Sequence, residues 1–226
     1  MKSAVIYVMA ILFTVAQSTS ENPESRLGAR LREGFSKGAD IESCDGLIDR
    51  EAVLVHSVFR ILREHVSVLN GLESSVDARK RRRARSDHPE ILDGITETIK
   101  RAKTDLSVVI RLVKKSKKIV RQVRSDRSLN GTERAELLQA SNQMILQAID
   151  QSDLLTEVTN ASLSHHREGL YSRKQKVAAV IGDAPDRLYR LLYRLEIVKM
   201  NASDLQARIK TSCASDLEQN KASKSN

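Results

Sequence analysis

The 226-residue sequence is poor in residues that break helices and in residues that stack on nucleobases. It contains three prolines, nine glycines, two cysteines and no tryptophan, and aromatic residues make up 3% of it. Scarce proline and glycine leave long stretches that can form uninterrupted helices. Two cysteines exclude a disulfide-rich scaffold. Scarce aromatic side chains argue against nucleic acid as a partner, because recognition of unpaired bases relies on aromatic stacking.

A continuous apolar run occurs only near the amino terminus. Lys2 precedes the apolar stretch 4–16, and small residues follow at Ser18 and Ser20. A positive charge, a short apolar region and small residues at its end are typical of a secretory signal peptide. The run is shorter than the roughly 20 residues that a membrane-spanning helix needs. We therefore expect residues 1–20 to be a signal peptide, the mature protein to be secreted, and no transmembrane segment to remain.

Beyond the leader, apolar residues recur at spacings of three and four, which is typical of amphipathic helices. The most regular pattern consists of Leu92, Ile95, Ile99, Ala102, Leu106, Val109, Val113, Ser116, Val120 and Val123. Similar patterns indicate a helix over 47–74, with Ile61 and Leu62 on its apolar face, and a helix from a cap at Thr132, with Val158 on its apolar face. A last helix after Pro185 has the apolar residues Leu188, Leu191, Leu195, Val198, Ala202, Leu205 and Ile209. The sequence therefore predicts an all-α fold, an antiparallel bundle of four long amphipathic helices plus one shorter helix around 170–181.

The same patterns divide the chain. We expect a polar amino-terminal arm at 21–46 and a helical bundle domain at 47–213. A basic linker at 75–89 interrupts the domain, and a disordered polar tail at 214–226 follows it. Heptads in the helices would also permit a homo-oligomer, because such seams can pair between chains.

The positive charge is concentrated in one segment. Residues 71–127 contain 17 Lys and Arg against 8 Asp and Glu, whereas the rest of the chain after the leader is nearly neutral. The predicted basic binding surface consists of Arg79, Lys80, Arg81, Arg82, Arg83, Arg85, Arg111, Lys114, Lys115, Lys117, Lys118, Arg121 and Arg124. A solvated helix face is the ordinary explanation of such a charge run. The uncompensated surplus favours an anionic partner instead, such as a glycosaminoglycan, an acidic cell surface or anionic lipid headgroups.

The two cysteines flank the predicted bundle. Cys44 precedes the first long helix and Cys213 follows the last. Four antiparallel helices bring these positions to the same end of the bundle, and secretion provides an oxidising compartment. We expect a Cys44–Cys213 disulfide. Secretion also makes the three sequons, at Asn130, Asn160 and Asn201, candidate N-glycosylation sites.

The basic run also permits a different function. Arg79-Lys80-Arg81-Arg82 resembles a furin-type proprotein convertase site, which predicts cleavage after Arg82, with a weaker match for cleavage after Arg85. The alternative function is a secreted signalling or pathogen-effector protein that a protein receptor recognises. The leader, sequons, disulfide and bundle resemble helical cytokines in outline, although the short turn at 125–131 departs from their long crossovers. Residues 60–64 (RILRE) resemble the RxLR translocation motif of pathogen effectors.

Motifs for catalysis are not found in the sequence. There is no glycine-rich phosphate loop, nucleophile elbow or HExxH pattern. The histidines, His56, His65, His88, His165 and His166, do not recur at metal-ligand spacing with carboxylates. We therefore predict a non-enzymatic protein with no catalytic residues, metal or cofactor.

Overall fold

The computed structural model describes residues 43–81, 89–171 and 180–222, except for the side chains of 167–171, 210, 211 and 213–222. The described residues form four long helices and no strand. The helices are α3 (Cys44–Arg81), α4 (Pro89–Ser125), α5 (Gly131–Tyr171) and α7 (Ala184–Ala222). The all-α prediction is confirmed for this part of the chain. The predicted signal peptide and nearly all of the predicted arm lie outside it.

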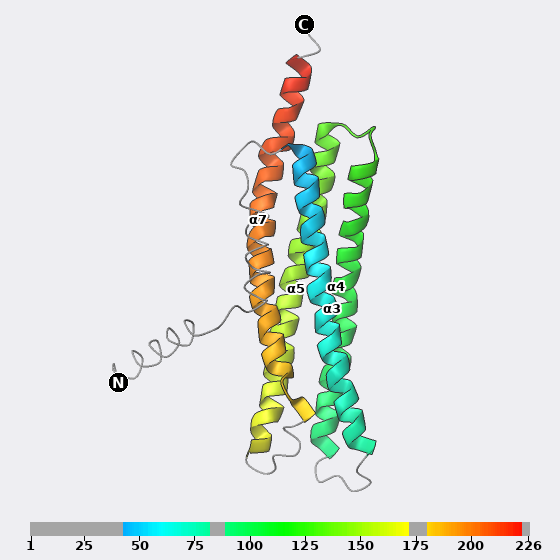
Figure 1. The fold of residues 1–226 in the computed structure, drawn as a ribbon, viewed down its shortest axis with the longest axis vertical. Helices are drawn as coiled ribbons and strands as arrows, with labels where there is room; N and C mark the ends of the chain where they lie inside the picture. Colours follow the sequence, from blue (N-terminus) through cyan, green and yellow to red (C-terminus); the bar gives the residue numbers. More distant parts are fainter. Residues whose placement is uncertain (1–42, 82–88, 172–179, 223–226) are drawn as a thin grey trace, which may run out of the picture. The chain divides into compact units, whose positions relative to one another are not determined.

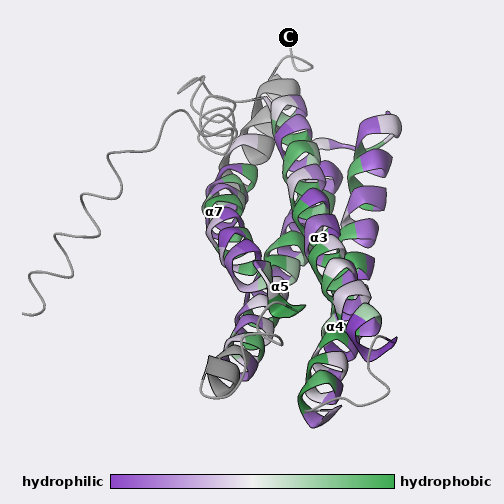
Figure 2. Cartoon of the chain, turned by 60° about the horizontal axis from the view of Figure 1, so that its bottom comes forward, coloured by the Kyte–Doolittle hydropathy of each residue, from purple (hydrophilic) through white to green (hydrophobic). Residues whose placement is uncertain are grey.

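The four helices pack as a bundle. Each long helix contacts the next one along the chain, and α7 also contacts α3, which closes the ring; α3 and α5 touch across it (Figure 1). Hydrophobic and hydrophilic residues share every helix, as amphipathic helices require (Figure 2). None of the described helices is both long and apolar enough to span a membrane.

Ion pairs show which ends of the helices meet. Arg124, in the last turn of α4, pairs with Asp49 near the start of α3. At the other end of α3, Lys80 lies 2.6 Å from a carboxylate oxygen of Asp93 in the second turn of α4. Glu64 in the middle of α3 pairs with Arg194 of α7.

The core confirms the predicted seams of α4 and α7. All ten seam residues predicted for α4 are buried. The seven predicted for the last helix are buried as well, namely Leu188, Leu191, Leu195, Val198, Ala202, Leu205 and Ile209. The break before α7 also lies where expected, because Gly182 adopts a left-handed backbone conformation with a φ of 55°.

The prediction for the ends of α3 was wrong. The helix begins at Cys44 because Ser43 caps it, accepting a hydrogen bond from the backbone N–H of Gly46 (3.3 Å). It continues to Arg81 because Val76 extends the apolar seam and is 1% exposed. Residues 75–81 are therefore helix, and the predicted linker at 75–89 can include at most 82–88, which are not described.

The buried face of α5 also differs from the prediction. Val158 was expected in the core, but its side chain is 59% exposed. Ser141, Ser152 and Thr156 are fully buried instead. The helix is capped by Asn130 rather than by Thr132, as shown below.

The carboxyl-terminal prediction was wrong as well. Helix α7 continues past Cys213 to Ala222, so 214–222 are helical rather than disordered. This stretch contains Leu, Glu, Gln, Lys and Ala without proline or glycine, a composition that favours helix. The shorter helix predicted at 170–181 falls mainly on 172–179, outside the described residues, although Val180 and Ile181 are helical and buried.

Candidate anion-binding surface

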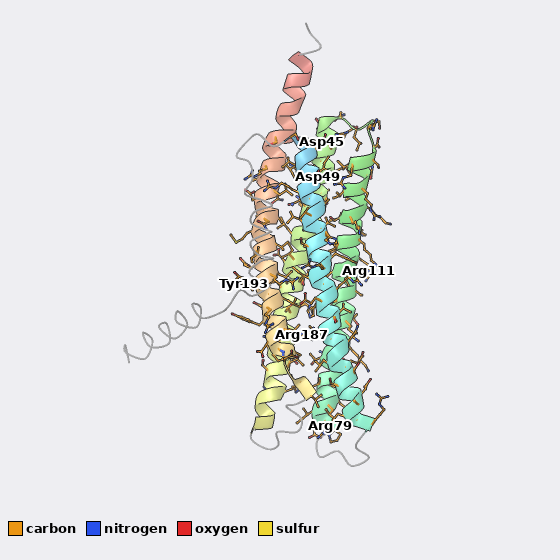
Figure 3. All side chains as sticks on the ribbon, in the orientation of Figure 1. Asp45, Asp49, Arg79, Arg111, Arg187 and Tyr193 are labelled. Atoms are coloured by element: carbon orange, nitrogen blue, oxygen red, sulfur yellow. The ribbon has the colours of Figure 1, made fainter. Side chains whose placement is uncertain are left out.

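The carboxyl-terminal half of α4 carries positive charge only. No Asp or Glu occurs between Asp105 and Asp126. The seven cations in this interval are Arg111, Lys114, Lys115, Lys117, Lys118, Arg121 and Arg124, and all seven are exposed. The core seam of α4 occupies the opposite side of the helix, so these side chains project outward, as Figure 3 shows for Arg111.

Six of these seven cations have no ionic partner among the described residues. Arg124 is neutralised by Asp49. The Nε of Arg111 donates a hydrogen bond to the carbonyl oxygen of Ser107 at 3.3 Å. The remaining five, Lys114, Lys115, Lys117, Lys118 and Arg121, form no salt bridge with a described carboxylate. We call these five residues the α4 cation cluster.

The first part of the basic run 79–85 lies elsewhere. Arg79, Lys80 and Arg81 form the last turn of α3, and Lys80 donates to Asp93 (2.6 Å) and Thr96 (3.0 Å) near the start of α4. Arg79 is half-buried, and its Nε and Nη2 have no partner within the described part.

The structure therefore separates two groups of residues that the sequence suggested as one surface. Lys114 is 21 residues from Asp93 along α4, which corresponds to about 30 Å of helix. Figure 3 shows Arg79 at one end of the bundle and Arg111 much farther along α4. Arg82, Arg83 and Arg85 lie outside the described residues.

A shallow groove of about 170 Å³ runs between α3 and α4 beside the α4 cation cluster. Its lining residues are Ala52, Val55, His56, Phe59, Lys117, Val120, Arg121 and Arg124. The ammonium nitrogen of Lys117 lies 5.8 Å from the centre of the Phe59 ring, within the range of a cation–π contact. Apolar and cationic side chains thus meet in one depression.

A polar cluster within the core was missed by the sequence analysis. Glu51 of α3 is fully buried. Its carboxyl group accepts hydrogen bonds from Ser141 Oγ (2.7 Å) and Asn142 Nδ2 (3.0 Å) of α5. Ser116 Oγ of α4 lies 2.8 Å from Ser141 Oγ. Burial raises the pKa of Glu51, and these hydrogen bonds only partly oppose that effect.

His65 forms a second buried polar contact between α3 and α5. Thr156 Oγ1 donates to the carbonyl oxygen of Ser152 (2.6 Å), so it accepts from His65 Nδ1–H at 3.3 Å. His65 Nε2 is buried without a partner among the described residues. Burial lowers the pKa of His65 to about 4.

The sequence did hold a signal for these contacts. Ser141, Ser152, Thr156 and Thr159 continue the spacing of three and four that passes through Ile145 and Ile149. All of them are buried. Following the helical period through polar residues would have revealed the true buried face of α5.

The sequons differ in their surroundings. Asn130 is exposed and caps α5: its Oδ1 accepts from the N–H of Glu133 (2.9 Å), while its own N–H donates to the Glu133 carboxylate (2.8 Å). Asn160 is half-buried, and its Oδ1 is buried without a partner in the described region. Asn201 is half-buried beside the buried Ala202.

The cysteine and RxLR-like predictions have different outcomes. Cys44 is buried, and the described part of the chain contains no free cysteine. The Cys213 side chain lies outside that part, so the Cys44–Cys213 bridge stays a prediction. In the RxLR-like segment, Ile61 and Leu62 are 3% and 0% exposed within α3, as the helical pattern predicted.

What the site offers is charge and shape: a row of exposed cations, a groove beside it and a packed helical support. Comparison with protein-family models, with curated proteins and with solved structures yields no match for this chain.

Proposed function

We propose that the protein is a secreted, non-enzymatic antiparallel helical bundle that binds an anionic extracellular partner, a glycosaminoglycan or an acidic cell surface. The α4 cation cluster supplies the binding charge. The supporting observation is that its five side chains are exposed and lack an ionic partner among the described residues.

The spacing of these cations suits a linear polyanion. Lys114, Lys118 and Arg121 succeed one another at intervals of four and three residues, so they lie about one helical turn, or roughly 5 Å, apart. A sulfated polysaccharide lying along α4 would meet several charges in succession. Because the side chains are already hydrated and unpaired, binding would not require existing ion pairs to break.

The leader-like sequence at 1–20 supports secretion, and the pairing of helix ends supports the antiparallel order. Arg124 with Asp49, and Lys80 with Asp93, place opposite ends of α3 and α4 together. Glu51 contacts Ser141, and His65, farther along α3, contacts Thr156, farther along α5. These two contacts support a common direction for α3 and α5, as an up-and-down order of four helices requires.

The test is retention on immobilised heparin. Replacing Lys114, Lys115 and Lys118 by Gln should lower the salt concentration needed for elution, because exposed charges act over the Debye length of about 8 Å at physiological salt. The matched control replaces Arg60, Arg63 and Lys100 by Gln, which removes the same charge from exposed positions outside the cluster. The control should elute close to the unmodified protein.

Equal losses in both triple variants would contradict the proposal, since they would show that net charge alone governs retention. Elution of the unmodified protein at trivial salt would contradict it as well. Circular dichroism of each variant confirms that helix content is unchanged.

A second candidate, recognition by a protein receptor, is favoured by exposed apolar side chains. The most exposed are Leu154 (63% exposed) and Val158 (59%) on α5, and Tyr189 (68%), Tyr193 (62%) and Met200 (66%) on α7. Apolar and aromatic side chains at the surface are typical of protein-binding sites.

Cleavage by a convertase belongs to this second candidate. Arg79, Lys80 and Arg81 are helical, so the last turn of α3 would have to unwind before a protease could bind the segment. Gels of secreted protein test this step. Two smaller fragments after reduction would show cleavage, and one intact band would contradict it.

A further inference from the structure

We propose that the groove between α3 and α4 is a binding site for a single aromatic ring that carries a sulfate or phosphate group. This inference goes beyond the proposed function, since a polysaccharide carries no aromatic ring. It rests on the combination of an apolar floor and a cationic rim within one depression of about 170 Å³.

The floor is made of hydrophobic side chains from both helices. Val55 and Val120 are 3% and 4% exposed, and the half-buried Phe59 presents its ring beside them. An apolar space of about 150 Å³ is enough to hold benzene. The groove therefore has the capacity for one ring, which could stack against Phe59 at an offset.

The rim carries cations on the α4 side. Lys117 and Arg121 are exposed and have no ionic partner among the described residues, whereas Arg124 is held by Asp49. His56 completes the rim on the α3 side. Arg121 can donate two parallel hydrogen bonds to oxygens of a sulfate or phosphate, and Lys117 adds a point charge.

The position of Lys117 links the two halves of the site. Its ammonium group lies over the Phe59 ring at 5.8 Å, so one cation borders both the apolar floor and the anion position. A ring lying on Phe59 would place its anionic substituent toward Lys117 and Arg121. Neither the ring contact nor the anion contact alone would bind the ligand tightly, because the groove is open to water and exposed ion pairs contribute little.

The experiment is calorimetric titration of the full-length secreted protein with 4-nitrophenyl sulfate and 4-nitrophenyl phosphate. Inorganic sulfate and inorganic phosphate serve as ring-free references. We expect each aromatic ester to bind at least tenfold more tightly than its inorganic anion. The sulfate and phosphate arms show which ester the site prefers.

Two double variants distinguish the charges that line the groove from those elsewhere on α4. Lys117→Ala with Arg121→Ala should weaken binding of the aromatic ester at least tenfold. The matched control, Lys115→Ala with Lys118→Ala, removes the same charge from the same helix outside the groove and should change the affinity less than threefold. Phe59→Leu keeps an apolar side chain. It should lower the affinity for the aromatic ester but leave the affinity for the inorganic anion unchanged.

Equal losses in the two charge variants would overturn the inference, as would equal affinity for esters and inorganic anions. The two proposals fail separately. Heparin retention without ester binding would overturn only the groove site. Ester binding without heparin retention would overturn only the polysaccharide-binding function.

Discussion

At the scale of single residues, the buried carboxyl group of Glu51 controls part of the pH dependence of stability. Its folded-state pKa is raised above the ordinary value of 4.5, so the native state holds the proton more tightly than the unfolded chain does. The free energy of unfolding should therefore fall as the pH rises above 4.5 through the raised pKa.

Glu51→Gln should stabilise the protein at neutral pH. The substitution replaces a carboxyl group, whose ionised form burial destabilises, by a neutral amide. A flipped Asn142 amide could accept from the new Gln amide through its otherwise unpartnered Oδ1. We expect a gain of about 1–3 kcal/mol at pH 7, measured by urea unfolding. The control Glu136→Gln, at an exposed position of α5, should change stability by less than about 0.5 kcal/mol. A loss of stability in Glu51→Gln would contradict this expectation.

His65 should give a pH dependence of the opposite sign. Its folded-state pKa of about 4 lies below the unfolded value of 6.5, so the unfolded chain binds more protons between these values. The contribution of neutral His65 to the free energy of unfolding is fully present above pH 6.5 and is lost as the pH falls towards 4. In a Glu51→Gln background, His65→Leu should reduce the change in unfolding free energy between pH 6.5 and pH 4, measured by urea unfolding at a series of pH values. An NMR titration that placed His65 near 6.5 would contradict this.

At the scale of helices, substitution of two interior glycines by alanine should have different effects on stability. A β-carbon at Gly71 of α3 would meet nothing within 4 Å, whereas one at Gly94 of α4 would lie 2.9 Å from the His166 ring of α5. Gly71→Ala should therefore raise the free energy of unfolding by about 0.5–1 kcal/mol, the usual gain in helix propensity.

Gly94→Ala should gain less than Gly71→Ala, or lose stability, because the His166 ring must move. Adding His166→Ala should restore part of the gain by removing the close contact. Thermal unfolding of all three variants measures the difference. Identical gains at Gly71 and Gly94 would show that α4 and α5 are not held as closely as the structure indicates.

At the scale of the whole molecule, a disulfide between Cys44 and Cys213 would join the first helix to the last. Arg50 near the start of α3 and Asp204 in the middle of α7 form a 3.9 Å ion pair, and Cys213 lies farther along α7. Such a bridge closes most of the bundle into one loop, and the chain-entropy model assigns it about 5 kcal/mol.

If the bridge forms, reduction should lower the thermal midpoint of the protein. The double variant Cys44→Ser, Cys213→Ser should show the lower midpoint without reductant and no further response to it. Titration that finds two free thiols per native, unreduced chain would exclude the bridge.

The sequence predicted those features that depend on local periodicity. All seam residues predicted for α4 and α7 are buried, because each follows its neighbour by three or four positions and all except Ser116 are apolar. The outward placement of the α4 cations followed from the same periodicity. Hydrophobic spacing determines one face of a helix without reference to its partners.

Other features required the tertiary structure, because they depend on contacts between distant segments. The cost of burying Glu51 is partly offset by a hydrogen bond from Ser141, 90 residues away in the sequence. No local sequence pattern predicts that contact. The basic run at 79–81 and the α4 cation cluster belong to the same basic segment of the sequence but are separated along the bundle. Lys80 pairs with Asp93 near the start of α4, whereas the cluster lies in the second half of that helix. Sequence alone thus determined which residues are buried along α4 and α7, but not the buried face of α5. Packing between helices decided which polar groups share the core and which cations share a surface, because those choices depend on the register of one helix against another.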